Sequence, residues 1–173
     1  MRHLIALVLL LWPASLCAKP GAPTWSAAMN GVTFGIFCAI DVTGQTEAPG
    51  TTSGYIHTID ATPGFDWPGQ RTVPASLGIA FGVQAQSAPG TAMPFAEMRV
   101  FRPGVAQPDT WITTLDDISP AFAFFRFDTD AELIPGRWAF EAWDANKRLY
   151  RVEFEVVPAD QAIGIANACG GMS

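Results

Sequence analysis

The chain of 173 residues contains little histidine, little charge and few cysteines, and each shortage excludes a class of function. Only His3 and His57 are present, so a Ser-His-Asp triad would have to use one of them, and the chain has no Gly-x-Ser-x-Gly nucleophile elbow. Charged residues make up 15% of the chain, with 16 acidic against 10 basic. The net charge of −6 opposes binding to nucleic acid or anionic lipid, because both depend on basic patches.

The sequence also lacks an apolar run long enough to span a bilayer, which takes roughly 20 residues. Its clearest run, residues 4–12, follows the basic start Met1-Arg2-His3 and precedes small and helix-breaking residues that end at Ala18. This order is typical of a secretory signal peptide. We therefore expect residues 1–18 to be removed, leaving a periplasmic or secreted protein with no stable membrane anchor.

Of the three cysteines, Cys17 lies in the predicted signal peptide. Leu16 stands where glycine, alanine or serine precedes a lipidated cysteine, which argues against a lipid anchor at Cys17. The remaining pair, Cys38 and Cys169, favours a disulfide in an oxidising compartment; the alternative is a buried free Cys38 and an unpaired Cys169. A disulfide would close a loop of about 130 residues, which the chain-entropy model associates with ~4–5 kcal/mol of stability.

Glycine and proline, in contrast, are plentiful, with 16 and 14 residues, and this spacing of turn residues suits short strands. A helical period is confined to the tail, where Asp160 is predicted to cap a short helix that runs to Cys169 and stops at Gly170. The length that remains after the signal fits one domain. The predicted division is a signal peptide at 1–18, a lead-in at 19–30, a β-sandwich domain at 31–158 and a C-terminal tail at 159–173.

Alternating apolar residues predict strands with one buried face. One such alternation covers residues 77–85, where the small residues Gly78, Ala80 and Gly82 would allow close packing over the outer face. Residues 122–127 are apolar at both parities, which predicts a central strand or one with a bulge. The remaining predicted elements are strands at 32–40, 53–59, 95–101, 137–143 and 149–156, and a long loop at 60–75.

The last two predicted strands form a hairpin whose register follows from core pattern and charge together. Trp138 and Phe140 would face the same core as Phe154 and Val152, and opposite charges across the ladder add up to ~1 kcal/mol each. A shift by two residues would set Glu141 against Glu153 or Leu149. The same parity places Trp143 on the solvent face beside Leu149. The predicted pairs are Trp138 with Phe154, Phe140 with Val152, Glu141 with Arg151 and Arg137 with Glu155.

Four fragments carry a family resemblance: GVTFGIF at 31–37, LGIAFGV at 77–83, PGRWAFEAW at 135–143, and Leu149 with FEV at 154–156. Together they resemble a family of exported bacterial proteins known as a domain of unknown function, over residues 30–157. The last two fragments look like the closing hairpin of many immunoglobulin-like domains. The resemblance implies an all-β, immunoglobulin-like antiparallel sandwich of about seven strands and no established activity, and it supplies no catalytic residues.

Metal and cofactor chemistry finds little support in the residues. One histidine outside the signal and two cysteines predicted to pair leave too few soft ligands for zinc. The run Asp128-Thr129-Asp130 resembles the start of a calcium loop, but Ala131 and Glu132 follow directly and the required glycine and distal glutamate are missing. We expect no metal and no cofactor, and interpret these aspartates as turn residues that cap backbone amides.

The candidate binding residues are His57, Asp60, Phe65, Trp67 and Trp143. The first four surround a loop, and loops on a rigid sandwich are where such folds place binding residues. Alternatively, Phe65 and Trp67 plug one end of the sandwich. Trp143 marks either a small apolar patch for a partner or a ring covered by the tail.

Three functions are therefore in competition. The first is a monomeric, non-enzymatic binding module of the cell envelope that contacts a protein or peptide. The second is a binder of a small ligand or carbohydrate at the His57–Trp67 region, and the third is a hydrolase with His57 as its base. A concave pocket around His57, Asp60 and Trp67 would favour the second or third, whereas a flat surface with Trp143 exposed would favour the first.

Overall fold

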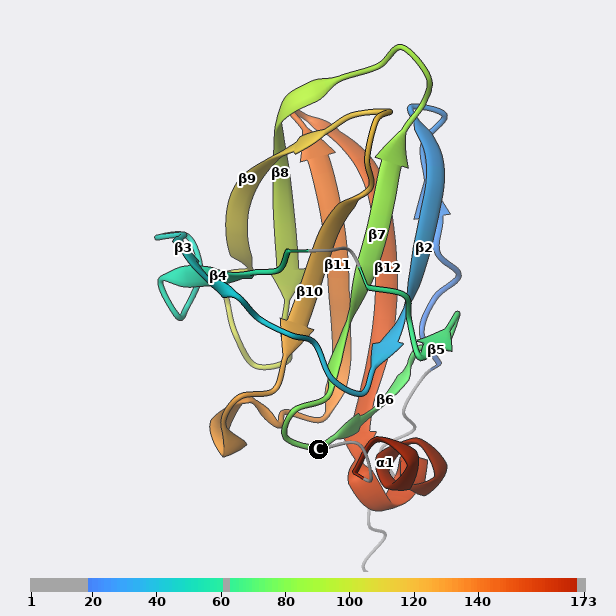
Figure 1. Cartoon of the computed structure of the whole chain (residues 1–173), viewed down its shortest axis with the longest axis vertical. Helices are drawn as coiled ribbons and strands as arrows, with labels where there is room; N and C mark the ends of the chain where they lie inside the picture. The colour runs from blue at the N-terminus through green and yellow to red at the C-terminus, as the bar shows by residue number, and fades with distance from the viewer. Residues whose placement is uncertain (1–18, 61–62, 171–173) are drawn as a thin grey trace, which may run out of the picture.

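The computed structural model describes residues 19–60 and 63–170, so the predicted signal peptide lies outside the described residues. The chain folds into two sheets that face each other across a common apolar core (Figure 1). Seven strands have six residues or more, which matches the predicted number, and five shorter strands add to them. This arrangement confirms the predicted all-β sandwich. Among the described residues, no helix has the length and apolar character needed to cross a membrane.

The larger sheet has the order β1-β12-β11-β8-β9, with β6 also paired to β12, and the smaller sheet has the order β10-β7-β2-β5. Neighbouring strands are antiparallel except for β6, which runs parallel to β12. The larger sheet contains β1 (Thr24–Trp25), β6 (Thr72–Ala75), β8 (Met93–Phe101), β9 (Asp109–Leu115), β11 (Gly136–Asp144) and β12 (Lys147–Pro158). The smaller sheet contains β2 (Met29–Phe37), β5 (Trp67–Pro68), β7 (Ala80–Ser87) and β10 (Ala121–Arg126).

The core is aromatic and centres on Phe81 of β7, which is fully buried. Its ring contacts rings from both sheets, with centroid distances of 5.1 Å to Phe154 and 5.4 Å to Trp138. The indole Nε1 of Trp138 donates to the carbonyl of Ile134 at 2.9 Å, so the buried polar atom is paired. The alternation seen in the sequence thus corresponds to one shared core.

The hairpin of β11 and β12 has the predicted register, and all four predicted pairs are present. The register shifts by one residue at Ala142/Trp143, because the two-residue turn pairs Asp144 with Lys147 and a bulge absorbs the offset. Trp143 therefore lies opposite Arg148, and its predicted position beside Leu149 is wrong. Leu149 is instead buried, with 3% exposure.

Strand β10 lies at the edge of the smaller sheet, so the prediction of a central strand at 122–127 is wrong. Its outward rings, Phe122 and Phe124, are covered because the segment between β2 and β5 folds back over this face. Phe65 from that segment packs on Phe37, with ring centroids 4.5 Å apart. Covering by this segment explains why an edge strand is apolar on both faces. It also agrees with the close packing predicted over the outer face of residues 77–85, where Ala80 is buried.

The region 60–75 is not a simple loop as predicted, since it contains β5 and β6. Strand β5 pairs with β2 in the smaller sheet, and β6 pairs with β12 in the larger one. This region therefore carries the chain from one sheet to the other. The segment before it holds β3 (Gly44–Glu47) and β4 (Tyr55–Thr58), which form a separate two-stranded ribbon. We call this pair the β3–β4 ribbon.

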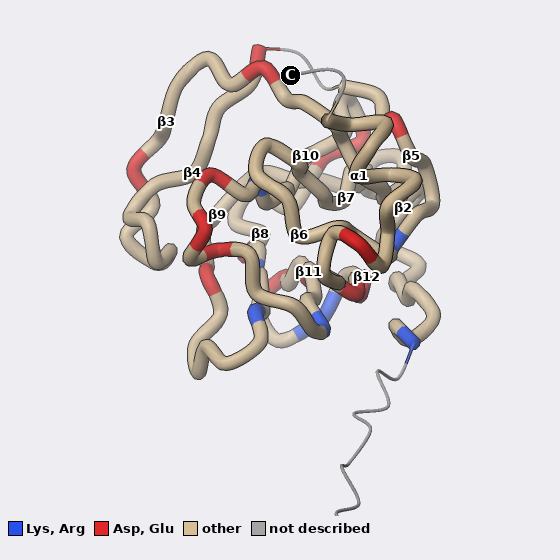
Figure 2. The backbone as a smooth tube through the Cα atoms, turned by 90° about the horizontal axis from the view of Figure 1, so that it is seen from below, with Lys and Arg blue, Asp and Glu red and all other residues tan. Residues whose placement is uncertain are grey.

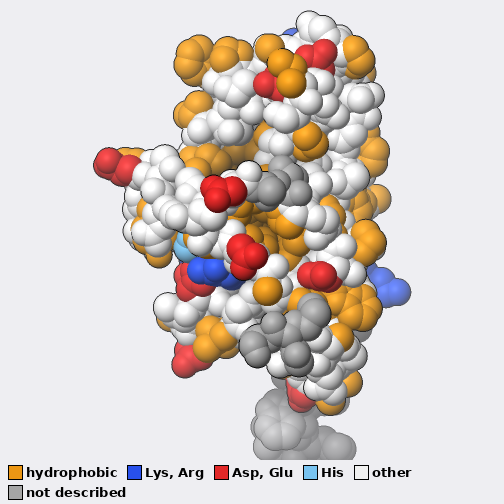
Figure 3. Space-filling view, in the orientation of Figure 1, with side chains coloured by type: hydrophobic (Ala, Val, Ile, Leu, Met, Phe, Trp, Pro, Cys, Tyr) orange, Lys and Arg blue, Asp and Glu red, His pale blue; other side chains and the backbone are white. Residues whose placement is uncertain are grey.

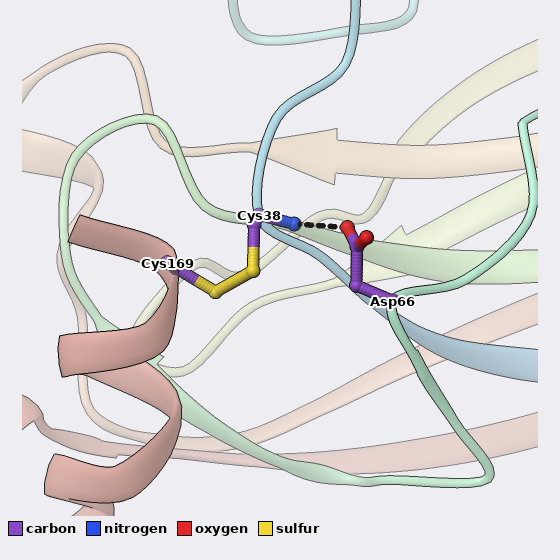
Figure 4. Close-up of a disulfide and its surroundings, with 3 residues drawn as sticks. All are labelled: Cys38, Asp66 and Cys169. Atoms are coloured by element: carbon purple, nitrogen blue, oxygen red, sulfur yellow. Dashed lines mark hydrogen bonds between the residues drawn. A yellow bond between two sulfur atoms is a disulfide. The ribbon is translucent and has the colours of Figure 1, made fainter. Parts of the chain in front are cut away.

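The predicted disulfide between Cys38 and Cys169 is present and joins the end of β2 to the tail (Figure 4). The tail forms a turn of 3-10 helix, η2 (Ala159–Ala162), and then α1 (Ile163–Gly170). Asp160 lies inside η2, whose N-cap is Pro158, so the predicted capping role of Asp160 is wrong. The backbone N–H of Cys38 donates to Asp66 at 2.8 Å, which fixes the residue on its other side (Figure 4).

Candidate functional site

The described residues enclose a cavity of about 90 Å³ where the β3–β4 ribbon lies beside β9 and β10 (Figure 1). These two strands are the neighbouring edges of the two sheets, so the ribbon covers an open side of the sandwich. We call this space the ribbon cavity. Figure 3 shows apolar side chains gathered in the hollowed centre of the same face, with a histidine and basic side chains to their left. The lining aromatic residues are Tyr55, His57, Trp111, Phe122, Phe124 and Phe125.

His57 on β4 is hydrogen-bonded at one ring nitrogen and unpaired at the other. Its Nε2 lies 2.8 Å from Oδ2 of Asp128, while its Nδ1 is buried and has no hydrogen-bond partner. The ring stacks on Phe124 at a centroid distance of 6.2 Å and an interplanar angle of 18°. Because a carboxylate only accepts hydrogen bonds, Nε2 of His57 is the donor to Asp128.

Asp128 follows β10 and is fixed from several sides. Arg126 Nε donates to its Oδ1 at 2.6 Å. Partial burial alone would raise the pKa of Asp128, but hydrogen bonds from Arg126 and His57 and the charges of both hold the pKa below its ordinary value. Glu132 accepts from the backbone N–H groups of Asp128 and Thr129 at 2.7 and 2.8 Å, in a capping box around η1 (Asp130–Glu132). The carboxylate that orients His57 is therefore ionised and held in position.

A second carboxylate fastens the other end of the ribbon segment. Asp109 on β9 is 7% exposed and accepts from the backbone N–H and the hydroxyl of Thr52 at 2.6 and 2.8 Å. Nε of Arg102 lies 3.0 Å from its Oδ2. The N–H of Thr110 also donates to the carbonyl of Gly50 at 2.9 Å. The ribbon is thus attached to β9 through Asp109 and to the end of β10 through Asp128.

The structure brings only His57, among the predicted site residues, to the ribbon cavity. Asp60 is exposed and lines a separate hollow together with Ile59 and Pro63. Phe65 covers the outer face of the smaller sheet, and Trp67 packs against the main core. The arrangement of these two rings agrees with the alternative in which they cover one part of the sandwich.

Trp143 lies on the outer face of the larger sheet, remote from the cavity lining. The guanidinium carbons of Arg99 and Arg148 lie 4.6 and 6.0 Å from its ring centroids, and its Nε1 donates to Glu141 at 2.6 Å. Two arginines, rather than the tail, therefore cover the half-buried ring.

Four further lining residues were not predicted as site residues: Tyr55, Trp111, Asp128 and Glu132. Tyr55 and His57 are two residues apart on one strand, so their shared face was available as a signal. Nothing in the sequence connects His57 with Asp128, which lies 71 residues further along the chain. That pairing depends on how the ribbon folds back on β10.

The groups that line the cavity are largely engaged by other parts of the chain. The nearest serine of the lining, Ser53, donates its hydroxyl to the carbonyl of Tyr55 at 2.8 Å, so it is occupied by backbone. Within the described part of the chain, no group of three or more His, Cys, Asp or Glu side chains is placed to hold a metal ion. The cavity is thus a small space lined by aromatic rings and carboxylates, next to His57, whose Nδ1 is buried and unpaired.

Comparison with known proteins gives a family and a related fold. A family model described as a domain of unknown function, DUF3859, matches residues 26–156, which confirms the resemblance found in the sequence. A crystal structure described as an immunoglobulin-like protein from Pseudomonas aeruginosa is similar, with 16% identity and a TM-score of 0.47. The similarity covers 83% of this chain and 100% of that chain. No curated protein matches the chain.

Proposed function

Because this chain belongs to the DUF3859 family of unknown function, we propose its function from its own geometry: it is a non-enzymatic module of the cell envelope that binds a small ligand in the ribbon cavity. The apolar run at 4–12 and the disulfide between Cys38 and Cys169 support export into an oxidising compartment. The proposed module acts without a cofactor.

The observation that carries this proposal is the unpartnered Nδ1 of His57 beside a cavity with aromatic walls. Buried polar atoms are nearly always hydrogen-bonded in folded proteins, so a buried nitrogen without a partner calls for an explanation. Ligand sites combine apolar and aromatic walls with a few placed polar groups. A small ligand would fill the space between these aromatic walls.

The size of the cavity limits the ligand. At about 90 Å³ it is smaller than an apolar cavity of ~150 Å³ that holds benzene, so a sugar ring does not fit inside. A carbohydrate would have to bind elsewhere, and the expected stacking platform, Trp67, packs against the core. The cavity suits a compact group of four or five heavy atoms.

The two competing functions have less support. A hydrolase would need a nucleophile near His57, and the hydroxyl of Ser53 is engaged by a backbone carbonyl. A protein-binding patch around Trp143 would need an exposed ring, whereas two arginines lie over that ring. A protein-binding patch at Trp143 does not account for the unpaired nitrogen of His57.

Two-dimensional NMR of residues 19–173 tests the proposal directly. Pools of compact amines, acids, alcohols and amides are added, and the indole N–H signals of Trp111 and Trp143 report on the cavity and on the opposite sheet face. We expect at least one pool to shift Trp111 and the amides of β4, and to leave Trp143 unchanged. His57→Phe should abolish the shift, and Asp60→Asn, a change outside the cavity, should preserve it. Shifts confined to Trp143, or no shift from any pool, would reject the proposal.

A further inference from the structure

We propose that the outer edge of β9 binds an extended, basic segment of a partner protein as an added strand of the larger sheet. This inference goes beyond the proposed small-ligand function and concerns a different surface from the ribbon cavity. Three observations support it: strand residues whose backbone groups face no neighbouring strand, exposed apolar side chains beside them, and an excess of negative charge at both ends of the stretch.

Strand β9 is the last strand of the larger sheet and pairs on one side only, with β8. Both ends of its other side are closed by neighbouring segments. The backbone N–H of Thr110 donates to the carbonyl of Gly50 at 2.9 Å. At the far end, the carbonyl of Asp116 accepts from the N–H of Ser87 at 3.0 Å. Figure 1 shows that the β3–β4 ribbon meets only the lower end of β9.

Ile112 and Thr114 lie between these two closed ends. Alternate residues of an antiparallel strand direct their backbone groups to the same side, so the N–H and C=O groups of both residues point away from β8, as those of Thr110 do. Among the described residues, no backbone group of another segment is hydrogen-bonded to them on this side. We call residues 112–114 the open edge. It offers the donors and acceptors with which another extended chain adds a strand.

The side chains at the open edge are apolar and exposed. Ile112 is 57% exposed, and Phe95 on the neighbouring strand β8 is 78% exposed. Ile112 lies opposite Glu97, which follows Phe95 by two residues, so the two apolar side chains are close neighbours in the sheet. Edge strands are commonly protected from pairing by charged residues or proline, and residues 110–115 contain neither. The edge is therefore suited to accept a strand.

Negative charge lies at the lower end of the open edge. Glu47 of the ribbon and Glu97 of β8 line an open hollow of about 400 Å³ together with Ile112. Arg99 pairs with Glu97, whereas Glu47 has no ion pair among the described residues. One carboxylate in this hollow is therefore uncompensated.

The other end of the open edge is also acidic, because Asp116 and Asp117 directly follow β9. Among the described contacts, both carboxylates accept only from backbone N–H groups, which leave their negative charge in place. Figure 2 shows acidic residues along β3, β4 and β9, whereas most basic residues lie on the side of β8, β11 and β12. A partner segment with lysine or arginine on either side of an uncharged centre complements this distribution.

The same charge argues against a second copy of this chain as the occupant. If two β9 strands paired antiparallel with Ile112 opposite Thr114, Thr110 of one copy would lie opposite Asp116 of the other. Glu47, which lines the same hollow as Thr110, would then meet a like charge. The closed ends also limit the pairing to three residues, about 10 Å of extended chain. This length fits a flexible segment better than the edge of a second sandwich.

The probe for this inference is a peptide capped at both ends, Lys-Thr-Val-Thr-Val-Thr-Lys, added to ¹⁵N-labelled residues 19–173. We expect saturable NMR shifts of the backbone amides of Ile112 and Thr114, because their N–H groups gain acceptors. The same peptide with glutamate in place of both lysines should bind about tenfold more weakly. The lysine peptide with methylated backbone nitrogens should not bind, because the methyl groups block strand pairing.

Two isoleucines of similar exposure provide matched variants, since Ile163 on α1 is 60% exposed. Ile112→Lys places a positive charge at the open edge and should weaken the lysine peptide several-fold. Ile163→Lys changes the net charge equally and should leave the affinity nearly unchanged. Thr114→Pro removes an N–H that points away from β8, a change that edge strands tolerate, and should also weaken the peptide. Thermal denaturation shows whether each variant is folded.

Three results would overturn the inference: no shift of the Ile112 and Thr114 amides, equal binding of the lysine and glutamate peptides, or equal loss in Ile112→Lys and Ile163→Lys. Sedimentation of the chain alone provides a further check. A dimer that is lost in Ile112→Lys would assign the open edge to a second copy and would likewise overturn the inference.

Discussion

Glu141 is the most unusual charged residue on the larger sheet, because it faces outward and yet is only 3% exposed. Arg151 and Arg148 donate to its Oε1, the latter at 3.3 Å, and Trp143 donates to its Oε2 at 2.6 Å. Trp143 lies two residues after Glu141 on β11 and so shares its face, and the bulge sets Arg148 opposite Trp143. One carboxylate thereby organises two guanidinium groups and an indole into a cover over the sheet.

Replacing this carboxylate should cost more stability than replacing an exposed one. Glu141→Gln removes the charge that pairs with both arginines, and we expect the free energy of unfolding to fall by about 1–3 kcal/mol. Urea denaturation followed by tryptophan fluorescence measures the change. Glu97→Gln is the matched control on the same sheet face, since Glu97 pairs only with Arg99 among the described contacts and should cost less than about 1 kcal/mol. Equal effects of the two variants would contradict this account.

For single residues, the sequence predicted which face of a strand a side chain occupies, but not its hydrogen-bond partners distant in the sequence. Parity alone placed Trp143 on the outer side of the sheet, and charge complementarity correctly paired Glu141 with Arg151. The bond between His57 and Asp128 joins residues 71 positions apart, and a period-two pattern contains no information on such a distance. Candidate site residues chosen by nearness in sequence therefore did not include Asp128.

Among the elements, β2 and β7 meet through two opposed glycines, Gly35 and Gly82. A Cβ built on Gly82 would lie 2.2 Å from the carbonyl oxygen of Ala123 in β10, and one on Gly35 would lie 2.5 Å from that of Trp67. Both contacts are with backbone, which cannot turn aside as a flexible side chain would. The smaller sheet is thus drawn tightly together where β10, β7, β2 and β5 adjoin.

Gly82→Ala should therefore strain the smaller sheet. We expect a loss of about 1–3 kcal/mol in the free energy of unfolding, because β10 has to move away from β7 to admit the methyl group. Gly31→Ala in β2 is the control, since nothing lies within 4 Å of its added Cβ. That variant should change stability by less than about 1 kcal/mol. Thermal denaturation compares the two variants. If Gly82→Ala leaves the stability unchanged, the sheet has room for a methyl group at this point.

Elements with regular alternation were the predictable ones. The hairpin of β11 and β12 has a buried face and complementary charges, and only one register of the two strands satisfies both. The short strands β3, β5 and β6 have two to four residues each, too few for a period to show. Strand β10 was misplaced because its outer face is covered by a chain segment, which makes an edge look like a centre.

For the whole molecule, the disulfide is the strongest single constraint. It joins Cys38 and Cys169, which are 131 residues apart, and holds α1 against the end of the sandwich from which β2 leaves. Both sulfur atoms belong to residues that are nearly buried, with exposures of 8% and 4%. The tail is thereby made part of the domain.

Removing this link should destabilise the whole domain without abolishing its fold. For the double variant Cys38→Ser and Cys169→Ser we expect a loss of about 2–5 kcal/mol, because the unfolded chain regains the freedom of a long loop. Guanidinium denaturation gives the loss, and hydrogen exchange should show that the amides of α1 become less protected than those of β7. Unchanged stability, with unchanged exchange in α1, would mean that packing alone holds the tail.

Strand β12 pairs with β11 along one side, and with β1 and then β6 along the other. It ends at Pro158, so both of its early partners, β1 and β6, are made long before it. During synthesis from the N-terminus, these segments have no partner until nearly the whole chain has emerged. Contacts between the first and last strands also give a high contact order, which slows folding. The nascent chain therefore exposes unpaired strands to chaperones until β12 is made and the domain folds cooperatively. A chain truncated before β12 should not fold.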